Sequence, residues 1–350
     1  MRVVVTGATG NVGTSVLSAL SADESVDEII GIARRLPGLA FPRTRFVSAD
    51  VARDDLVEAF RGADVVVHLA WLIQPSRDRA ETRLVNVEGS RRVFEAAATA
   101  GVPSLVHASS VGAYSPGPKD RRVDESWPTE GIPTSFYSRD KAQVESILDS
   151  YELQHPDMRV VRLRPGLIFK GDAASGIRRL FAGPLLPTTL LRRRLIAIVP
   201  SLERLVFQGV HSLDVGEAYR LAALSDARGP FNVAAEPVLD PPELGRLLGA
   251  RPVRVPEKAL HVAVDVSWKL RLQPTPAGWL DLALGVPLMD TTRAHEELGW
   301  RPTRSAGDAL LELIDAMRRG DGLDTAPLAP GGTGPLRIRE FLTGVGRASR

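Results

Sequence analysis

The chain has 350 residues, of which 44% are hydrophobic and 25% charged, a composition typical of a globular protein with a sizeable core. It contains no cysteine, which excludes disulfides, thiolate catalysis and cysteine-bound metal. Its formal net charge of +2 gives no electrostatic reason to expect a nucleic-acid partner. No apolar run approaches the roughly 20 residues that span a bilayer, and the first expected strand begins at residue 2. We therefore expect no signal peptide, no membrane partner and a cytoplasmic location.

An apolar, β-branched run at residues 2–6 breaks into a glycine-rich loop and then continues as a helical pattern. Gly7 permits a tight turn, Gly10 lets the backbone approach a pyrophosphate, and Gly13 allows a helix to pack closely on a sheet. Free N–H groups at the start of the helix can face the anion. The spacing G-x-x-G-x-x-G therefore predicts a dinucleotide-binding loop, with a purely steric role for the glycines as the alternative. The predicted contacts of the loop are Gly7, Gly10, Asn11, Val12 and Gly13.

Short β-branched runs alternate with longer helical patterns through the first two thirds of the chain. The expected strands are Arg2–Thr6, Glu28–Ala33, Arg45–Ser48, Val65–Leu69, Leu105–Ala108 and Arg159–Leu163. The expected helices include Asn11–Leu20, Leu84–Ala100 and Phe136–Tyr151. This alternation predicts an α/β fold with a Rossmann-type, doubly wound parallel sheet, whose ligands bind at the carboxyl ends of the strands.

The residues after the second and third expected strands bear on the choice of dinucleotide. A carboxylate at the end of the second strand would bind the ribose 2′-OH and repel a 2′-phosphate, which favours NAD. This chain has Arg34 and Arg35 there, and their guanidinium groups suit phosphate. We therefore expect NADP, with NAD as the alternative if these arginines only stack on adenine or face water. Asp50 and Val51, after the third strand, are expected to contact the adenine edge.

A serine, a tyrosine and a lysine follow in an order that suits acid–base chemistry. Ser110 comes just after the apolar run at residues 105–108, and its neighbour Ser109 would point to the opposite face of a continuing strand. Tyr137 and Lys141 lie four positions apart in the next long helix, and so share one face. A phenol with an ordinary pKa near ~10 needs a nearby positive charge to act at neutral pH. Lys141 supplies that charge.

Together these motifs resemble the extended short-chain dehydrogenase/reductase family, which includes nucleotide-sugar epimerases, dehydratases and ketone reductases. The resemblance covers residues 1–318 and includes Ser-Val-Gly-Ala-Tyr at residues 110–114, which matches the family's Ser-x-x-x-Tyr signature. It implies that Ser110, Tyr137 and Lys141 are catalytic, with Ser110 bonding the substrate oxygen and Lys141 also holding the nicotinamide ribose. Further contacts to the cofactor implied by the resemblance come from Leu69, Ala70, Lys141 and Pro165.

The remaining polar candidates are expected to support the structure. His68 ends an apolar strand and is expected to be a hydrogen-bonded core residue. His211 and Asp214 could form an acid–base pair, but the family resemblance favours a structural role for them. Asn86 is expected to support a water or the helix near the active site. No group of histidines and carboxylates has metal-ligand spacing, so we predict no metal site.

Frequent prolines break the chain into short pieces after residue 164. We expect a cofactor-binding domain over residues 1–164 and a smaller substrate-binding lobe over 165–318, interleaved with returns to the sheet. Residues 190–200 are expected to form an exposed basic turn before a strand at 195–199, with a membrane-surface anchor as the alternative. A flexible connection and tail are expected over 319–350; for the tail, packing on the body and disorder both remain open.

The resemblance leaves two programmes open: net redox with cofactor exchange, and redox-neutral epimerisation or elimination with retained NAD. Val111 and Gly112 stand where dehydratases carry an acidic pair, and Gly166 stands where nucleotide-sugar enzymes usually carry asparagine. We therefore expect an NADP-dependent carbonyl reductase or alcohol dehydrogenase acting on a small molecule. The alternatives are a nucleotide-sugar epimerase with retained NAD, in which Arg192–Arg194 could hold a diphosphate, and a non-catalytic cofactor-binding protein. A homodimer is left open.

Overall fold

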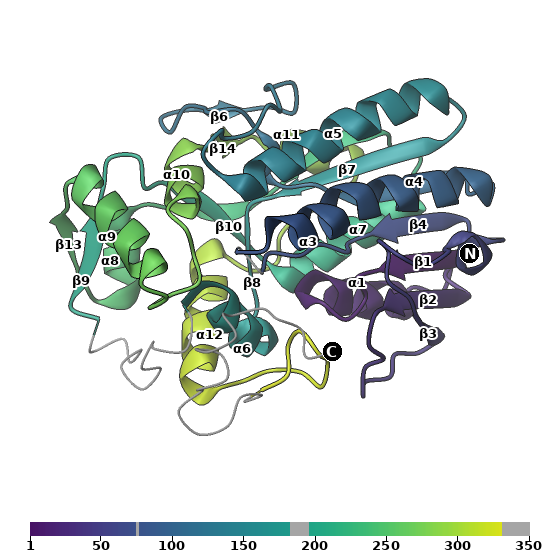
Figure 1. The fold of residues 1–350 in the computed structure, drawn as a ribbon, viewed down its shortest axis with the longest axis horizontal. Helices are drawn as coiled ribbons and strands as arrows, with labels where there is room; N and C mark the ends of the chain where they lie inside the picture. The colour runs from purple at the N-terminus through teal and green to yellow at the C-terminus, as the bar shows by residue number, and fades with distance from the viewer. Residues whose placement is uncertain (75–76, 183–195, 331–350) are drawn as a thin grey trace.

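The computed structural model describes residues 1–74, 77–182 and 196–330 (Figure 1). Its centre is a seven-stranded sheet in the order β11-β7-β5-β4-β1-β2-β3, in which every neighbouring pair is parallel. The strands are β1 (Arg2–Thr6), β2 (Glu28–Ala33), β3 (Thr44–Ser48), β4 (Val65–His68), β5 (Ser104–Ala108), β7 (Arg159–Pro165) and β11 (Gly229–Val233). The order reverses between β1 and β4, where a doubly wound sheet binds its ligand. The predicted Rossmann-type fold is confirmed.

Helices cover both faces of the sheet (Figure 1). Side chains of a strand point alternately to opposite faces, so Val3 and Val5 of β1 enter one core while Val4 enters the other. The first core is closed by α1 (Asn11–Ala22) and α7 (Ser212–Leu224), and the second by α2 (Val57–Phe60), α4 (Gly89–Thr99) and α5 (Phe136–Gln154). Both cores are apolar and fully buried, which explains why these strands read as near-continuous hydrophobic runs.

Two local features differ from the expectation. The seventh strand, β11, was not predicted because its sequence Gly-Pro-Phe-Asn-Val carries a proline and an asparagine. Proline is tolerated there because β11 is an edge strand that pairs only with β7. The expected helix at residues 84–100 is divided: α3 (Arg79–Arg83) runs into a π-helical turn, Leu84–Glu88, before α4 begins.

The chain after β7 builds a smaller lobe and also returns to the sheet through α7 and β11. The lobe lies beside the carboxyl ends of the strands, on the left in Figure 1. Its strands form three small sheets. The first has β8 (Leu167–Phe169), β10 (Phe207–His211) and β12 (Ala235–Leu239), and the second has β9 (Ile198–Ser201) and β13 (Arg251–Arg254). The third pairs β14 (Leu288–Met289) with β6 (Arg122–Val123), which comes from the chain before β7. Its helices are α6 (Ala174–Ile177), α8 (Pro241–Leu248), α9 (Glu257–Lys269), α10 (Gly278–Gly285), α11 (Thr292–Glu297) and α12 (Ala306–Arg319).

The segment expected to be a flexible connection is packed as far as residue 330. Thr325 and Leu328 are buried, and Gly38 N–H donates to the Asp324 carbonyl at 3.1 Å. The composition of this segment, rich in Gly, Pro and Asp, does not indicate the packing, because few buried residues and a few backbone hydrogen bonds hold the segment in place. The expected basic turn at 192–194 and the tail after 330 lie outside the described residues. The strand expected at 195–199 is observed as β9, beginning at Ile198.

In the part of the chain that the structure describes, none of the helices has the length and apolar character needed to cross a membrane.

Candidate active site

The glycine loop between β1 and α1 is closed to side chains at two of its three glycines. Gly7 has φ +70°, and a Cβ there would lie 2.7 Å from the backbone nitrogen of Ala70. A Cβ on Gly13 would lie 2.3 Å from the Gly7 carbonyl oxygen. Gly7 is therefore needed for the turn and for the approach of the loop after β4, and Gly13 for the close packing of α1.

Gly10 is different, because among the described residues only the Gly7 carbonyl oxygen lies near the space above it. A Cβ on Gly10 would meet only the Gly7 carbonyl oxygen, at 3.4 Å. Gly10 is the N-cap of α1 and provides no side-chain cap, and the buried Oδ1 of Asn11 has no hydrogen-bond partner among the described residues. The start of this twelve-residue helix thus offers N–H groups and open space, which fits a pyrophosphate.

The other expected cofactor contacts lie at the strand ends around this loop. Leu69 N–H donates to the Thr6 carbonyl at 3.1 Å, which places the end of β4 beside β1. Pro165 is buried at the end of β7. Val51 is buried after β3, whereas the Asp50 carboxylate accepts hydrogen bonds from Ala52 N–H and Arg53 and so closes its own turn.

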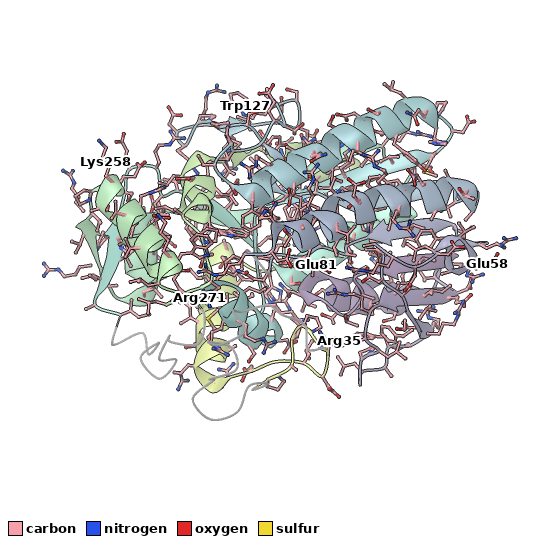
Figure 2. The ribbon with its side chains drawn as sticks, in the orientation of Figure 1. Arg35, Glu58, Glu81, Trp127, Lys258 and Arg271 are labelled. Carbon is pink, nitrogen blue, oxygen red and sulfur yellow. The ribbon has the colours of Figure 1, made fainter. Side chains whose placement is uncertain are left out.

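Arg34 and Arg35 are exposed just beyond the end of β2. Figure 2 shows Arg35 at the surface near the ends of β2 and β3. An exposed guanidinium has water as a ready partner, so its presence at this position does not by itself select a 2′-phosphate.

Helix α5 carries Tyr137 and Lys141 on one face. Ser135 caps its N-terminus by accepting a hydrogen bond from Ser138 N–H. Lys141 is 3% exposed, and its ammonium donates to the Ala108 carbonyl at the end of β5, at 2.6 Å. Burial lowers the pKa of Lys141 to about 7, against the charges of nearby carboxylates that raise it. The ammonium therefore sits where a small change in its surroundings decides its charge.

Tyr137 lies against the loop that carries Ser110. Burial raises the pKa of Tyr137, and a hydrogen bond with the Ser110 hydroxyl lowers it. A Cβ on Gly112 would lie 2.8 Å from Cε1 of Tyr137 and 3.3 Å from Oγ of Ser110. Gly112 N–H also donates to Ser110 Oγ at 3.0 Å. In the sequence, Gly112 was notable only because no acidic pair stands at residues 111–112. The structure adds a steric reason: only a glycine at this position lets the Tyr137 ring reach Ser110.

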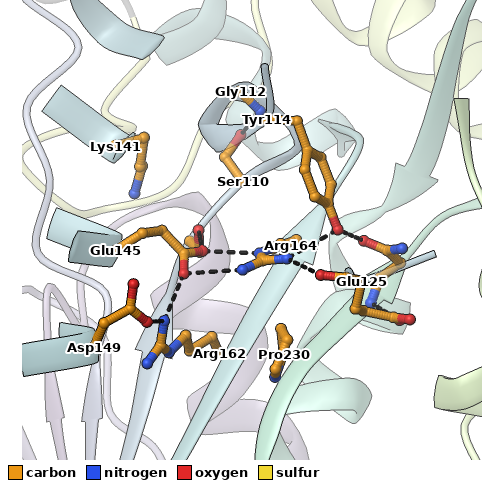
Figure 3. Close-up of polar contacts among 12 residues, drawn as sticks. Ser110, Gly112, Tyr114, Glu125, Lys141, Glu145, Asp149, Arg162, Arg164 and Pro230 are labelled. Atoms are coloured by element: carbon orange, nitrogen blue, oxygen red, sulfur yellow. Dashed lines mark hydrogen bonds and ion pairs between the residues drawn. The ribbon is translucent and has the colours of Figure 1, made fainter. Parts of the chain in front are cut away.

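A buried ion cluster lies beneath the catalytic candidates (Figure 3). Glu145, one turn after Lys141, accepts hydrogen bonds from Nε and Nη2 of Arg164 at 2.8 and 3.0 Å, from Arg162 at 2.9 Å and from the Ser109 hydroxyl. Burial alone would raise the pKa of Glu145, but the two arginines lower it to about 2. Ser109 therefore faces this cluster while Ser110 faces the site, as the strand alternation predicts.

The cluster continues to Tyr114 and the edge of the sheet. Arg164 also donates to the Tyr114 hydroxyl at 3.1 Å, and this hydroxyl donates to Oδ1 of Asn232 in β11 at 2.7 Å (Figure 3). Tyr114 is fully buried, and burial raises its pKa to about 12. Its side chain thus ties the Ser110 loop to two strands. Sequence reasoning did not find Glu145 or this network, because its members come from four separate elements.

Aromatic rings surround Tyr137. Its ring centroid lies 5.9 Å from that of Trp71 and 4.9 Å from that of Trp279, and Trp279 is 5.0 Å from Phe181. The Lys141 ammonium lies 3.5 Å from the Trp71 ring centroid. A cavity of about 360 Å³ opens beyond Trp279. A second hollow, of about 340 Å³, lies between α4 and α5 and includes none of the residues predicted for the site.

The polar residues expected to be structural are fully engaged by the protein. His68 is bonded on both ring nitrogens, by Thr6 at 2.7 Å and Ser90 at 2.9 Å, and burial lowers its pKa to about 3. His211 contacts Glu312 rather than Asp214, which accepts from Thr303 and Arg304. Asn86 exchanges two hydrogen bonds with the backbone of Leu72, so it fixes the loop that carries Trp71. The described residues contain no cluster of three or more histidines and carboxylates placed to hold a metal.

Comparison with known proteins now adds the family. The model of the NAD dependent epimerase/dehydratase family matches residues 3–171. An L-arabinose 1-dehydrogenase (NAD(P)(+)) of Haloferax volcanii is 33% identical over 182 residues, which cover 49% of this chain and 68% of that protein. The chain belongs to the NAD-dependent epimerase/dehydratase family. This confirms the resemblance drawn from the glycine loop and the Ser, Tyr and Lys motifs.

A second sequence relative and a solved structure are also similar to this chain. An uncharacterized protein of Mycobacterium tuberculosis is 28% identical over 327 residues, 92% of this chain, but the chain spans only 31% of that protein's length. The solved UDP-glucose 4-epimerase of Thermus thermophilus, in complex with NAD, has a TM-score of 0.65 and 23% identity, covering 91% of this chain and 99% of the epimerase. The structural likeness shows the shared fold.

The expected preference for NADP over NAD is not supported by these comparisons, in which the name of the Haloferax dehydrogenase includes both dinucleotides. The family model is described by NAD, and the solved neighbour contains NAD. The two arginines on which the expectation depended are exposed side chains at the strand end, and nothing in the described structure orients them toward a ribose. NAD, the alternative, is the better supported cofactor.

Proposed function

We propose that this chain is an NAD-dependent enzyme that removes a hydride from, or returns it to, the carbinol or carbonyl carbon of a small molecule. The observation that carries the proposal is the arrangement around Tyr137: Ser110 touches the phenol and Lys141 lies one helical turn away. Ser110 follows the carboxyl end of β5, and Tyr137 and Lys141 lie on α5, from which the Lys141 ammonium reaches the last carbonyl of β5. A binding protein without chemistry has no need of this trio.

The glycine loop, Asn11 and Lys141 are the groups that would hold the dinucleotide, and NAD when bound supplies the hydride acceptor. Tyr137 takes the proton from the substrate hydroxyl during oxidation and gives it back to the carbonyl oxygen during reduction. Ser110 donates a hydrogen bond to the same oxygen and keeps it in place. Lys141 stabilises the phenolate by its positive charge, which offsets the burial that raises the pKa of Tyr137.

Two tryptophans keep the reaction away from water. Trp71 covers the ammonium of Lys141, and Trp279 covers the outer side of the Tyr137 ring. Asn86 holds the backbone of Leu72 and thereby the position of Trp71. In a site with little water, the charge of Lys141 acts on the phenol more strongly than it would in solvent.

Of the two cycles this site can run, we propose the redox-neutral one, in which NAD is retained and a carbinol carbon is epimerised through its ketone. The family model and the solved epimerase with NAD support this cycle. The expected NADP-dependent carbonyl reductase has less support. Net oxidation or reduction with exchange of NAD remains the second candidate. It is favoured by the 33% sequence identity to a dehydrogenase, a match that covers 49% of this chain.

The test begins with the cofactor of the purified protein. We expect mass spectrometry of the denatured protein to find NAD, not NADP, and to find it still bound after dialysis. Tyr137→Phe should retain NAD but lower turnover by ~10²-fold or more, the scale of acid–base catalysis. A variant with near-normal turnover would contradict the role of Tyr137. Stoichiometric consumption of added NADH by the wild type would contradict the retained-NAD cycle and support net reduction with exchange of NAD.

A further inference from the structure

The geometry points to a substrate whose reacting carbon carries an apolar ring or chain, which occupies the cavity beyond Trp279. The inference rests on the proposed function, in which Tyr137 is the proton donor, because Trp279 of the cavity wall packs on the Tyr137 ring. The cavity has a volume of about 360 Å³, within the range of small-molecule sites. Its apolar walls come from the π-helical turn Arg178–Ala182, from α9, from α10 and from the segment before α10. The apolar residues are Phe181, Val264, Pro276, Trp279 and Leu280.

The polar side chains that line the cavity are used by the protein itself. Ser267 Oγ donates to the Val264 carbonyl at 2.9 Å, and Thr275 Oγ1 donates to the Phe181 carbonyl at 2.7 Å. Gln273 binds the backbone of Thr275 with both ends of its amide. Turned to the backbone in this way, these groups leave carbon atoms facing the cavity. None of the lining residues in the described part of the chain is charged.

Trp279 connects the cavity to the chemistry. The ring centroid of Trp279 lies 4.9 Å from that of Tyr137 and 5.0 Å from that of Phe181. Trp279 is the residue shared by the cavity wall and the packing around Tyr137, since the lining itself does not include Tyr137, Ser110 or Lys141. A molecule whose oxygen meets Tyr137 can reach the cavity by extending along the Trp279 indole. The Nε1 of Trp279 is buried and has no hydrogen-bond partner among the described residues, so the surface that Trp279 offers the cavity is the carbon of its indole.

These walls suit an apolar group better than a nucleoside diphosphate. A diphosphate brings negative charges that require cations or several N–H donors, whereas the lining described here offers aromatic and aliphatic carbon. Burying apolar surface in such a pocket is favourable in proportion to the area removed from water. The retained-NAD cycle needs only a secondary alcohol, so it does not require a nucleotide sugar.

The experiment measures binding to the NAD-loaded protein by quenching of tryptophan fluorescence, with calorimetry as a check. The probes are 2-decalone, a bicyclic apolar ketone; 2-butanone, which has the same carbonyl and little else; and UDP-glucose. We expect 2-decalone to bind at least tenfold more tightly than 2-butanone and not to be displaced by UDP-glucose. Tighter binding of UDP-glucose than of 2-decalone, or equal binding of the two ketones, would overturn the inference.

A matched pair of variants on α9 locates the site. Val264 lines the cavity, whereas Val262 on the same helix is 60% exposed and does not line it. Val264→Asn should weaken 2-decalone binding about tenfold, and Val262→Asn should leave it unchanged, with NAD content equal in both. Leu280→Asn, on α10, repeats the measurement from another wall. Equal affinities in Val264→Asn, Leu280→Asn and the wild type would overturn the inference.

The two proposals fail in different ways. Binding of the ketone, measured by tryptophan fluorescence, does not depend on hydride or proton transfer, so it should persist in Tyr137→Phe. A protein that binds 2-decalone in this cavity but shows no Tyr137-dependent hydride transfer would contradict the proposed function and leave the apolar pocket in place. Tyr137-dependent turnover of UDP-glucose without binding of 2-decalone would support the proposed function and contradict the apolar pocket.

Discussion

Adjacent serines at the end of β5 have different surroundings and therefore different expected roles. Ser109 donates to the buried Glu145 carboxylate, and Ser110 contacts Tyr137. The division follows from the alternation of side chains along an extended backbone. Gly112 then brings the two active-site groups into contact, because it has no Cβ to hold the Tyr137 ring away.

The serine pair gives a prediction that separates chemistry from stability. Ser110→Ala should lower turnover by roughly 10- to 100-fold, because the substrate oxygen loses a positioned donor, with little change in unfolding. Ser109→Ala removes a hydrogen bond to a charged group and should cost about 1.5–3 kcal/mol of stability, with the smaller effect on turnover. Kinetics and urea unfolding of both variants check this. The reverse pattern would assign the catalytic role to Ser109.

Gly112→Ala tests the contact that sequence reasoning missed. The added Cβ would have to displace the Tyr137 ring or the Ser110 hydroxyl, so turnover should fall roughly tenfold or more, as expected for a misplaced acid–base group. NAD binding should be unchanged, since the atoms nearest to a Cβ on Gly112 belong to Tyr137 and Ser110 and not to the glycine loop. Normal turnover in a folded variant would show that the ring can move at no cost to the reaction.

At the scale of elements, α5 couples the catalytic pair to the buried ion cluster. Lys141 and Glu145 lie one turn apart on its inner face, so the Glu145 carboxylate raises the pKa of Lys141 against the burial that lowers it to about 7. The same carboxylate holds Arg162 and Arg164 of β7. One helix therefore positions Tyr137 and Lys141 and sets the charge near them.

Glu145→Gln should shift the pH dependence of turnover. Loss of the negative charge lowers the pKa of Lys141 further, so the ammonium loses its proton at a lower pH and the alkaline fall in kcat/KM should move downward. Asp149→Asn is the matched control, because Asp149 also pairs with Arg162 but is 61% exposed and is not among the groups that shift the pKa of Lys141. Identical pH profiles in the two variants would show that Glu145 has no electrostatic influence on the site.

The glycine loop and α1 form the second functional element. Gly10→Val should place a β-branched side chain in the space above the helix start and weaken NAD binding roughly tenfold or more, which corresponds to about 1.4 kcal/mol. The fold should survive, because a Cβ there meets only the Gly7 carbonyl oxygen at 3.4 Å. Calorimetric titration of the folded variant with NAD measures the effect. Unchanged affinity would mean that the open space serves no ligand.

For the whole molecule, the buried cluster at Glu145 links stability to pH. The folded pKa of Glu145, about 2, is below its ordinary value of 4.5, so its contribution is complete above pH 4.5 and is lost as the pH falls toward 2. Glu145→Ala, which leaves two arginines without their buried partner, should cost about 3–5 kcal/mol at neutral pH. The free energy of unfolding, measured with urea between pH 7 and pH 3, should fall less with decreasing pH in Glu145→Gln than in the wild type. Parallel curves would place the acid-sensitive group elsewhere.

The sequence by itself determined the parallel sheet, the glycine loop and the positions of Ser110, Tyr137 and Lys141 as candidates. These features depend on local rules: alternation of strands and helices, glycine spacing, and residues four apart on a helix. Bounds of most strands agree with the prediction to within one or two residues. The preference for NADP also came from a local pattern, the position of Arg34 and Arg35 after β2, but both side chains are exposed.

Only the tertiary structure decided what surrounds the reaction. Glu145, Arg164, Tyr114 and Asn232 meet from α5, β7, the Ser110 loop and β11, and no spacing in the sequence signals that meeting. Trp71 and Trp279 likewise approach Tyr137 from opposite ends of the chain. The physical reason is that packing and buried charge pairs join residues by proximity in space, which sequence patterns do not encode, and the walls of the substrate cavity are built from such contacts.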